Sequence, residues 1–232
     1  SKKNLLTDRR LFTFVVTAHS DMISQLNEDK LFMKAVKDAY ITFDGQIPYL
    51  LARIKFPTKR IEKISGSSFI YDICEEASRL DKKIFLLGGI SECNNKSVDI
   101  LNARYGVNIK GYSPPFNNYP FPNSVQSDIL KELIEFSPDY LLVAFGAKKQ
   151  EMWIDDNRDF LMNIGVKFAM GVGGTFEMVA NKYKRAPYLL QILGFETIFR
   201  FIQDPSAVRL KRTFNSFKIF KYLFFKSKDR VG

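Results

Sequence analysis

The chain has 232 residues, of which 46% are hydrophobic and 14% aromatic, a composition that excludes an intrinsically disordered protein. No run of about 18 apolar residues occurs, so we expect no membrane-spanning helix, and Cys74 and Cys93 are too few for a disulfide or metal framework. The formal net charge is +10, and residues 182–232 hold 12 of the 35 basic residues but only 3 of the 25 acidic ones. This concentration of basic residues predicts that the C-terminal end of the chain binds an anionic partner. No apolar segment of a signal peptide follows residues 1–4, so we expect no secretory leader.

Short apolar runs alternate with helix-length segments. We expect strands at residues 11–17, 39–43, 83–88, 107–112, 140–145 and 166–171, and helices at residues 20–37, 46–55, 67–80, 94–105, 124–136 and 149–163. Such alternation, with nearly continuous apolar strands, predicts an α/β fold: a Rossmann-like, mostly parallel sheet with helices on both faces. We expect an α/β domain at residues 1–190 and a basic helical appendage at residues 191–232.

A helix is predicted to begin at Pro205, because proline is favoured in the first helical turn. At helical spacing, one side of this segment is apolar and aromatic and the other side is basic, except that Lys221 falls near the centre of the apolar side, from which its long side chain can reach phosphates. The apolar members are Leu210, Phe214, Phe217, Phe224 and Phe225, and the basic members are Lys211, Arg212, Lys218 and Lys226. This pattern is typical of a helix at a membrane interface, and a helix packed on the body through its Phe face is the alternative.

Small or polar residues follow most of the predicted strands, where ligands of parallel α/β sheets bind. Asp44, after the second strand, could act as a general base or could be an ordinary turn aspartate before Gly45. Thr17 and His19, the only histidine, follow the first strand. The glycines that would let a nucleotide or sugar approach the backbone are Gly88, Gly89, Gly146, Gly173 and Gly174.

Residues 145–151 leave a strand and enter a helix. The start of a helix favours anions, and Lys149 would add charge. Gln150 and Glu151 could bind a uracil or a sugar, and an ordinary helix start is the alternative. The glycine-rich run at 171–174 lacks the third glycine of a dinucleotide fingerprint, and the chain has neither a P-loop nor an HExxH or Asp-x-Asp metal motif. We therefore expect no cofactor and no metal.

Taken together, these motifs resemble the WecG/TagA/CpsF family of glycosyltransferases (glycosyltransferase family 26) over about residues 13–212. The matching segments are Thr17, Asp44-Gly45, residues 63–66, Leu87-Gly88-Gly89, residues 146–151, residues 171–177 with 184–187, and residues 194–212. The chain departs from the family pattern at His19 (usually Asn), Lys148 (Pro), Glu177 (Asp) and Thr197 (Trp), and by two residues inserted after Arg200.

The resemblance implies an inverting, metal-independent transferase. It would move a sugar, of the N-acetylmannosamine type or a hexose, from a UDP-sugar to a polyprenyl-diphosphate-linked acceptor in bacterial surface polysaccharide or teichoic acid synthesis. Asp44 would be the base, Thr17 would orient Asp44 or the donor, and Arg209 and Arg212 would neutralise the leaving diphosphate. Arg185 and Arg200 are further phosphate candidates. The remaining junction residues, His19 included, would bind substrate.

Because basic and aromatic side chains share the tail, we expect the appendage at residues 191–232 to dock on an anionic membrane and to complete the site of the catalytic domain at residues 1–190. The protein would be cytoplasmic and peripheral on the inner face of the bacterial membrane, and a homo-oligomer stays open. One alternative is a nonenzymatic scaffold that binds a nucleotide-sugar or a lipid carrier, suggested by the departures above. A nucleic-acid-binding protein is another, but the nearly neutral body and the lack of an RNA-binding motif speak against it.

Overall fold

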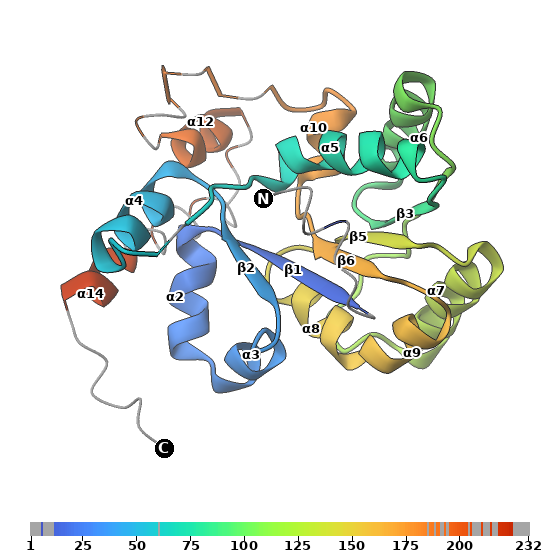
Figure 1. Cartoon of the computed structure of the whole chain (residues 1–232), viewed down its shortest axis with the longest axis horizontal. Coiled ribbons are helices and arrows are strands. Elements are labelled where there is room, and N and C mark those ends of the chain that lie inside the picture. Colours follow the sequence, from blue (N-terminus) through green and yellow to red (C-terminus); the bar gives the residue numbers. More distant parts are fainter. Residues whose placement is uncertain are drawn as a thin grey trace. The chain divides into compact units, whose positions relative to one another are not determined.

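A computed structural model provides the structure, which describes residues 6, 12–59, 61–184, 186–187, 189–190, 193, 195–203, 205, 210, 214 and 218–224 (Figure 1). The sheet has six strands in the order β2-β1-β6-β5-β3-β4. The pairs β1–β6, β6–β5, β5–β3 and β3–β4 are parallel. The strands are β1 (Thr13–Ala18), β2 (Tyr40–Phe43), β3 (Ile84–Gly88), β4 (Ile109–Tyr112), β5 (Tyr140–Ala144) and β6 (Phe168–Gly171). All six predicted strands, and the α/β fold class, are confirmed.

The helices agree closely with the sequence pattern in the first 165 residues. They are α2 (Ser20–Glu28), α3 (Lys30–Ala35), α4 (Gln46–Lys55), α5 (Gly66–Arg79), α6 (Ser91–Tyr105), α7 (Asn123–Phe136), α8 (Lys149–Asp156), α9 (Arg158–Asn163), α10 (Thr175–Val179), α12 (Glu196–Gln203) and α14 (Ile219–Phe224). The helix predicted at 20–37 is divided at Asp29, whose carboxylate accepts from the backbone N–H groups of Leu31 and Phe32 and so caps α3. The helix predicted at 149–163 is divided at Asn157.

The central strands are buried because helices cover both faces of the sheet. In β1, β3, β5 and β6 every residue is buried, which explains their continuous apolar sequence. In Figure 1, α5, α6 and α10 cover one face, and α7, α8 and α9 cover the other. The fully buried Trp153, Phe69, Phe85 and Phe168 are among the largest side chains of this core.

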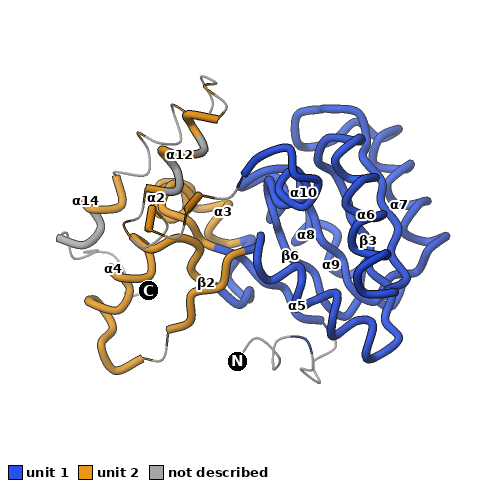
Figure 2. Tube along the Cα trace, turned by 90° about the horizontal axis from the view of Figure 1, so that it is seen from above, with its two compact units in different colours: residues 1–17, 35–41, 66–184 blue, residues 18–34, 42–65, 185–232 orange. Residues whose placement is uncertain are grey.

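The chain forms two compact units, each built from three segments (Figure 2). Unit 1 comprises residues 1–17, 35–41 and 66–184, and unit 2 comprises residues 18–34, 42–65 and 185–232. Unit 1 holds β3 to β6 and the helices around them. The expected division into domains at residue 190 stays a prediction.

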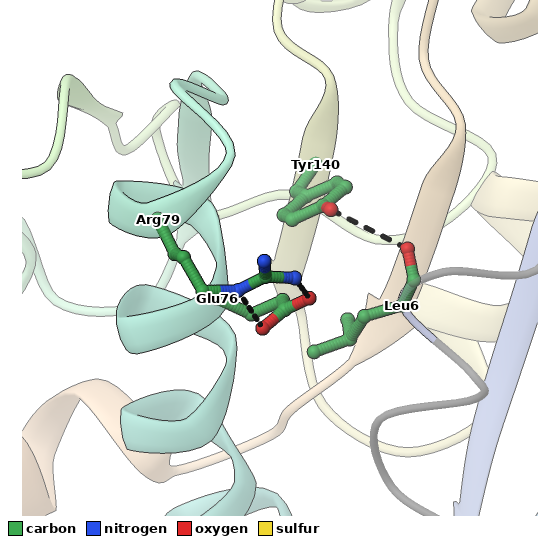
Figure 3. Close-up of polar contacts among 4 residues, drawn as sticks. All are labelled: Leu6, Glu76, Arg79 and Tyr140. Carbon is green, nitrogen blue, oxygen red and sulfur yellow. Dashed lines mark hydrogen bonds and ion pairs between the residues drawn. The ribbon is translucent and has the colours of Figure 1, made fainter.

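Polar groups at the amino end of β5 are paired with near neighbours (Figure 3). The hydroxyl of Tyr140 donates to the carbonyl oxygen of Leu6 at 3.4 Å, and burial raises the pKa of Tyr140 to about 12. On α5, Arg79 donates twice to the buried Glu76, at 2.5 and 3.0 Å. The Tyr140 bond holds Leu6 at the end of β5 where parallel sheets do not bind ligands, whereas the Arg79–Glu76 pair lies within α5.

The tail is only partly described. Within unit 2, α14 packs against α2 and α4, Ile219 is buried, and Lys218 lies 3.7 Å from Glu28. The predicted helix from Pro205 falls largely outside the described residues, so neither its membrane contact nor its packing through Phe217 and Phe225 is tested. In the described part of the chain, no helix combines the length and apolar character needed to span a membrane.

Candidate functional site

The connections of the sheet diverge at the carboxyl end of β5. The chain leaves β5 into α8 on one face, whereas the neighbouring strands β3 and β6 lead into α6 and α10 on the other face (Figure 1). In open α/β sheets, ligands bind in the crevice that such diverging connections create. The sequence predicted a ligand site at the ends of most strands. The strand order narrows this site to the three junctions that follow β3, β5 and β6.

The predicted glycines of unit 1 gather at this edge because of the strand register. Gly88 pairs with Ala144 of β5, and Gly171 pairs with Val143 of β5 and with Val16 of β1. Gly88, Gly89, Gly146 and Gly173 all have positive φ angles, which a residue without Cβ adopts at little cost. Gly89, Gly146 and Gly173 are half-buried and Gly174 is exposed, so their backbone is accessible to a ligand.

Thr17 joins β1 to this edge. Its hydroxyl donates to the carbonyl oxygen of Gly171 at 3.3 Å, and the residue is buried. This hydrogen bond holds Thr17 in a fixed position beside the glycine-rich β6–α10 junction. Its hydroxyl oxygen can still accept a hydrogen bond, as a residue that orients a neighbour would require.

Gln150 and Glu151 form a buried pair behind these glycines. Gln150 Nε2 donates to Glu151 Oε1 at 2.7 Å, and Gln150 Oε1 accepts from the backbone N–H of Gly173 at 3.1 Å. A Cβ atom on Gly171 would lie 2.5 Å from Gln150 Nε2 and 2.6 Å from Glu151 Oε1. Gly171 is needed for this close approach, and the pair couples the β5–α8 junction to the β6–α10 junction.

Glu151 is the most strongly perturbed acid in this part of the molecule. It is 1% exposed, and among the described residues no donor reaches its buried Oε2 atom. Burial raises the pKa of Glu151 from an ordinary 4.5 to about 7, opposed by the hydrogen bond from Gln150 and by backbone N–H groups. A buried carboxyl with a shifted pKa at the ligand-binding edge of a sheet is a typical mark of a functional site.

An aromatic loop, residues 113–122, is fastened to the start of α8. Lys149 Nζ donates to the carbonyl oxygen of Asn117 at 2.6 Å and lies 4.8 Å from the centre of the Phe116 ring. Phe121 packs on Phe145 with ring centroids 4.9 Å apart. Burial lowers the pKa of Lys149. Lys149 therefore holds the loop against the start of α8. Only its remaining N–H groups could bind an anion.

Lys148 has an unusual backbone. Its φ of 70° and ψ of −51° are sterically costly for a residue with a side chain, and it forms the N-cap of α8. Proline, which the family pattern has at this position, is restricted to φ near −65°. The departure at Lys148 therefore accompanies a backbone conformation that proline cannot adopt.

Unit 2 holds the other predicted residues. Asp44 directly follows β2 and is half-buried, and its backbone N–H donates to the carbonyl oxygen of Ala18. Gly45, with φ of 93°, is the N-cap of α4. His19 is the N-cap of α2: its Nδ1 accepts from the backbone N–H of Met22 at 3.2 Å, so a neutral His19 carries its proton on Nε2.

The structure does not describe where the side chains of the four predicted arginines lie. Arg185, Arg209 and Arg212 lie outside the described residues, and Arg200 falls in α12 but its side chain is not described. Within the described ranges, no three His, Cys, Asp or Glu side chains gather closely enough to hold a metal ion. The arginine roles and metal independence stay predictions.

Two supporting residues were missed by the sequence analysis. Asn94 Nδ2 donates to the carbonyl oxygens of Gly88 and Leu86, at 2.7 and 3.0 Å, and Ser113 donates to Gly88 at 2.8 Å. Together they fix the carbonyl of Gly88 at the end of β3. Their only signal in the sequence is a polar residue one turn after Gly88-Gly89 and a serine directly after a predicted strand.

Comparison with known proteins identifies a family and relatives that share one name. The family described as "Glycosyl transferase WecG/TagA/CpsF family" matches residues 3–231. Two relatives, from Staphylococcus aureus strains MRSA252 and MW2, are each 29% identical over 221 residues, which cover 94% of this chain and 82% of the relative. Both are named N-acetylglucosaminyldiphosphoundecaprenol N-acetyl-beta-D-mannosaminyltransferase.

Proposed function

Because the chain belongs to the WecG/TagA/CpsF family of glycosyl transferases, we propose that it transfers a sugar from a UDP-sugar to a saccharide linked to polyprenyl diphosphate. The match over residues 3–231 is the observation that carries this proposal. The names of the Staphylococcus relatives favour N-acetylmannosamine as the sugar and N-acetylglucosaminyl-diphospho-undecaprenol as the acceptor. The product would serve bacterial surface polysaccharide or teichoic acid synthesis.

In the proposed reaction, an acceptor hydroxyl attacks the anomeric carbon of the donor sugar. Asp44 takes the proton of that hydroxyl as general base, the new glycosidic bond forms, and the bond to UDP breaks with inversion. UDP leaves with the electron pair of the broken bond. Arg209 and Arg212, assisted by Arg185 and Arg200, would stabilise the charge that develops on its diphosphate. No metal is needed in this scheme.

Unit 1 would bind the donor at the carboxyl end of β5. The accessible backbone at Gly146, Gly173 and Gly174 suits the approach of a nucleotide or sugar. Gln150 and Glu151 would contribute by holding the β5–α8 and β6–α10 junctions together, since Gln150 donates to Glu151 and accepts from the backbone N–H of Gly173. Thr17, His19 and Lys149 complete the proposed set of substrate-binding and orienting residues.

The lipid-linked acceptor places the reaction at a membrane surface. We expect a cytoplasmic protein, peripheral on the inner face of the membrane, whose basic tail binds anionic lipid; each Lys or Arg near such a surface contributes about 1 kcal/mol. Removal of residues 205–232 should abolish turnover of the lipid-linked acceptor and weaken vesicle binding by at least about tenfold. Wild-type levels of both in the shortened protein would overturn this part of the proposal.

The test is a panel of UDP-sugars with a polyprenyl-diphosphate-linked acceptor, read by mass spectrometry with and without chelator. We expect one UDP-sugar to be transferred, with equal yield in both conditions. Asp44→Asn should lower UDP release at least about 100-fold, whereas Asp38→Asn, at an exposed position in the turn before β2, should not. Equal release by wild type and Asp44→Asn would remove Asp44 as the base. The absence of transfer from every donor would favour the alternative, a nonenzymatic scaffold that binds a nucleotide-sugar or lipid carrier.

A further inference from the structure

Helix α4 of unit 2 presents apolar side chains to solvent. Leu50 and Ile54 are four residues apart, hence on one face of the helix, and are 46% and 71% exposed. Phe56, which follows the helix directly, is 44% exposed. The buried side of α4 is formed by Pro48 and Ala52. Leu50, Ile54 and Phe56, here called the α4 surface, are therefore not core residues of the fold.

Cationic side chains lie beside the α4 surface. Lys59 Nζ is 5.5 Å from the centre of the Phe56 ring, and the Arg53 guanidinium is 5.9 Å from the ring of Tyr49. Lys55 ends the helix and is exposed. Residues 46–63 hold five basic residues and one acidic residue. Apolar side chains with cations at their margin are the pattern of a helix that lies in a membrane interface.

Charge and exposed apolar groups are concentrated in the same unit. Unit 2 carries 17 basic and 8 acidic residues, a net charge of +9, whereas unit 1 carries 18 and 17, a net charge of +1. Of the 16 large apolar side chains exposed in the described part of the chain, 12 belong to unit 2. The segment 42–65 contributes +3 by itself, independently of the tail.

These properties select one partner. An anionic phospholipid surface offers phosphates for Arg53, Lys55 and Lys59, and beneath them an apolar layer for Leu50 and Ile54. A nucleic acid offers phosphates without the apolar layer. A second copy of this chain would bring two units of +9 together, which repel each other.

We propose that α4 is a second membrane contact of this protein, with Leu50, Ile54 and Phe56 inserted at the headgroup level of an anionic bilayer. This extends the proposed function, in which the acceptor is anchored in the same bilayer, and rests on it for its biological purpose. The C-terminal tail is then one of two membrane-binding segments that lie far apart in the sequence.

A tryptophan at the α4 surface tests the contact directly. Ile54→Trp in the full chain should show a blue-shifted emission when vesicles of phosphatidylcholine and phosphatidylglycerol (about 7:3) are added, and quenching by brominated lipid. The natural Trp153 is fully buried and provides a constant background. The matched control is Ile134→Trp on α7 of unit 1, where Ile134 is 56% exposed; it should not respond. An unresponsive Ile54→Trp on vesicles that have bound the protein would overturn the proposal.

A second pair of variants measures the contribution to binding. Ile54→Asp should bind the same vesicles about tenfold or more weakly than wild type, whereas Ile134→Asp should bind with a loss of about twofold or less. Circular dichroism and thermal unfolding of each variant establish that it is folded. Equal binding by the two variants would overturn the proposal, as would a change from dimer to monomer with Ile54→Asp and no change in vesicle binding. Transfer to a water-soluble acceptor is measured separately, so a failure of the membrane contact is distinguishable from a failure of the proposed function.

Discussion

The buried carboxyl of Glu151 should make the stability of the protein depend on pH in a defined window. Its pKa is about 7 in the folded protein, compared with an ordinary 4.5, so the folded state binds the proton more tightly than the unfolded chain. The contribution of Glu151 is therefore complete below about pH 4.5 and is lost as the pH rises to about 7. Between pH 5 and pH 7 this loss amounts to about 2 kcal/mol of unfolding free energy, given full burial of the group.

Glu151→Gln removes this titration while retaining an amide oxygen that can accept from Gln150. The two extra N–H groups of the new amide impose a cost that does not vary with pH. We therefore expect the free energy of unfolding of Glu151→Gln, relative to wild type, to increase by about 2 kcal/mol from pH 5 to pH 7 and to change little above pH 8. Urea denaturation at pH 5, 6, 7 and 8 measures this difference.

The matched control is Glu75→Gln, which neutralises an exposed carboxyl on α5. Its stability relative to wild type should change far less over the same pH range. If the curves of wild type and Glu151→Gln stay parallel from pH 5 to pH 8, then Glu151 does not hold a proton at neutral pH, and the account of the buried pair is wrong.

Three further substitutions test other parts of the structure. Gly171→Ala should destabilise the protein by about 1–3 kcal/mol in urea denaturation, because its Cβ would lie 2.5 Å from Nε2 of Gln150; a neutral effect would show that this junction can relax. Arg212→Ala should lower kcat/KM on the order of 100-fold with UDP-sugar and acceptor, whereas Lys211→Ala should have little effect, and equal losses would remove the specific role of the arginine. Asp29→Ala should lower the unfolding free energy by about 1 kcal/mol through loss of the α3 cap; an unchanged value would indicate that backbone groups alone hold that helix start.

Agreement between sequence and structure is closest where local patterns decide the outcome. The strands β1, β3, β5 and β6 were predictable because a strand covered on both faces must be apolar along its whole length. Gly45 and Gly88 were predictable as special positions because glycine after a strand indicates a backbone that a residue with a side chain rarely adopts, and both have positive φ. In contrast, the break at Asp29 depends on a side-chain cap, which competes with continuation of the helix and is only weakly encoded.

The candidate site likewise combines features that the sequence shows with features that only the fold shows. The sequence by itself determined which residue types stand at the strand ends, that the basic charge is concentrated late in the chain, and that the ordered motifs belong to one family. Only the tertiary structure decided that β5 lies between β3 and β6, that Gln150 and Glu151 are buried behind Gly171 and Gly173, and that residues 42–65 share unit 2 with the basic tail. The physical reason is that strand order and burial arise from contacts between segments far apart in the sequence, and no local pattern records which distant segment a residue will meet.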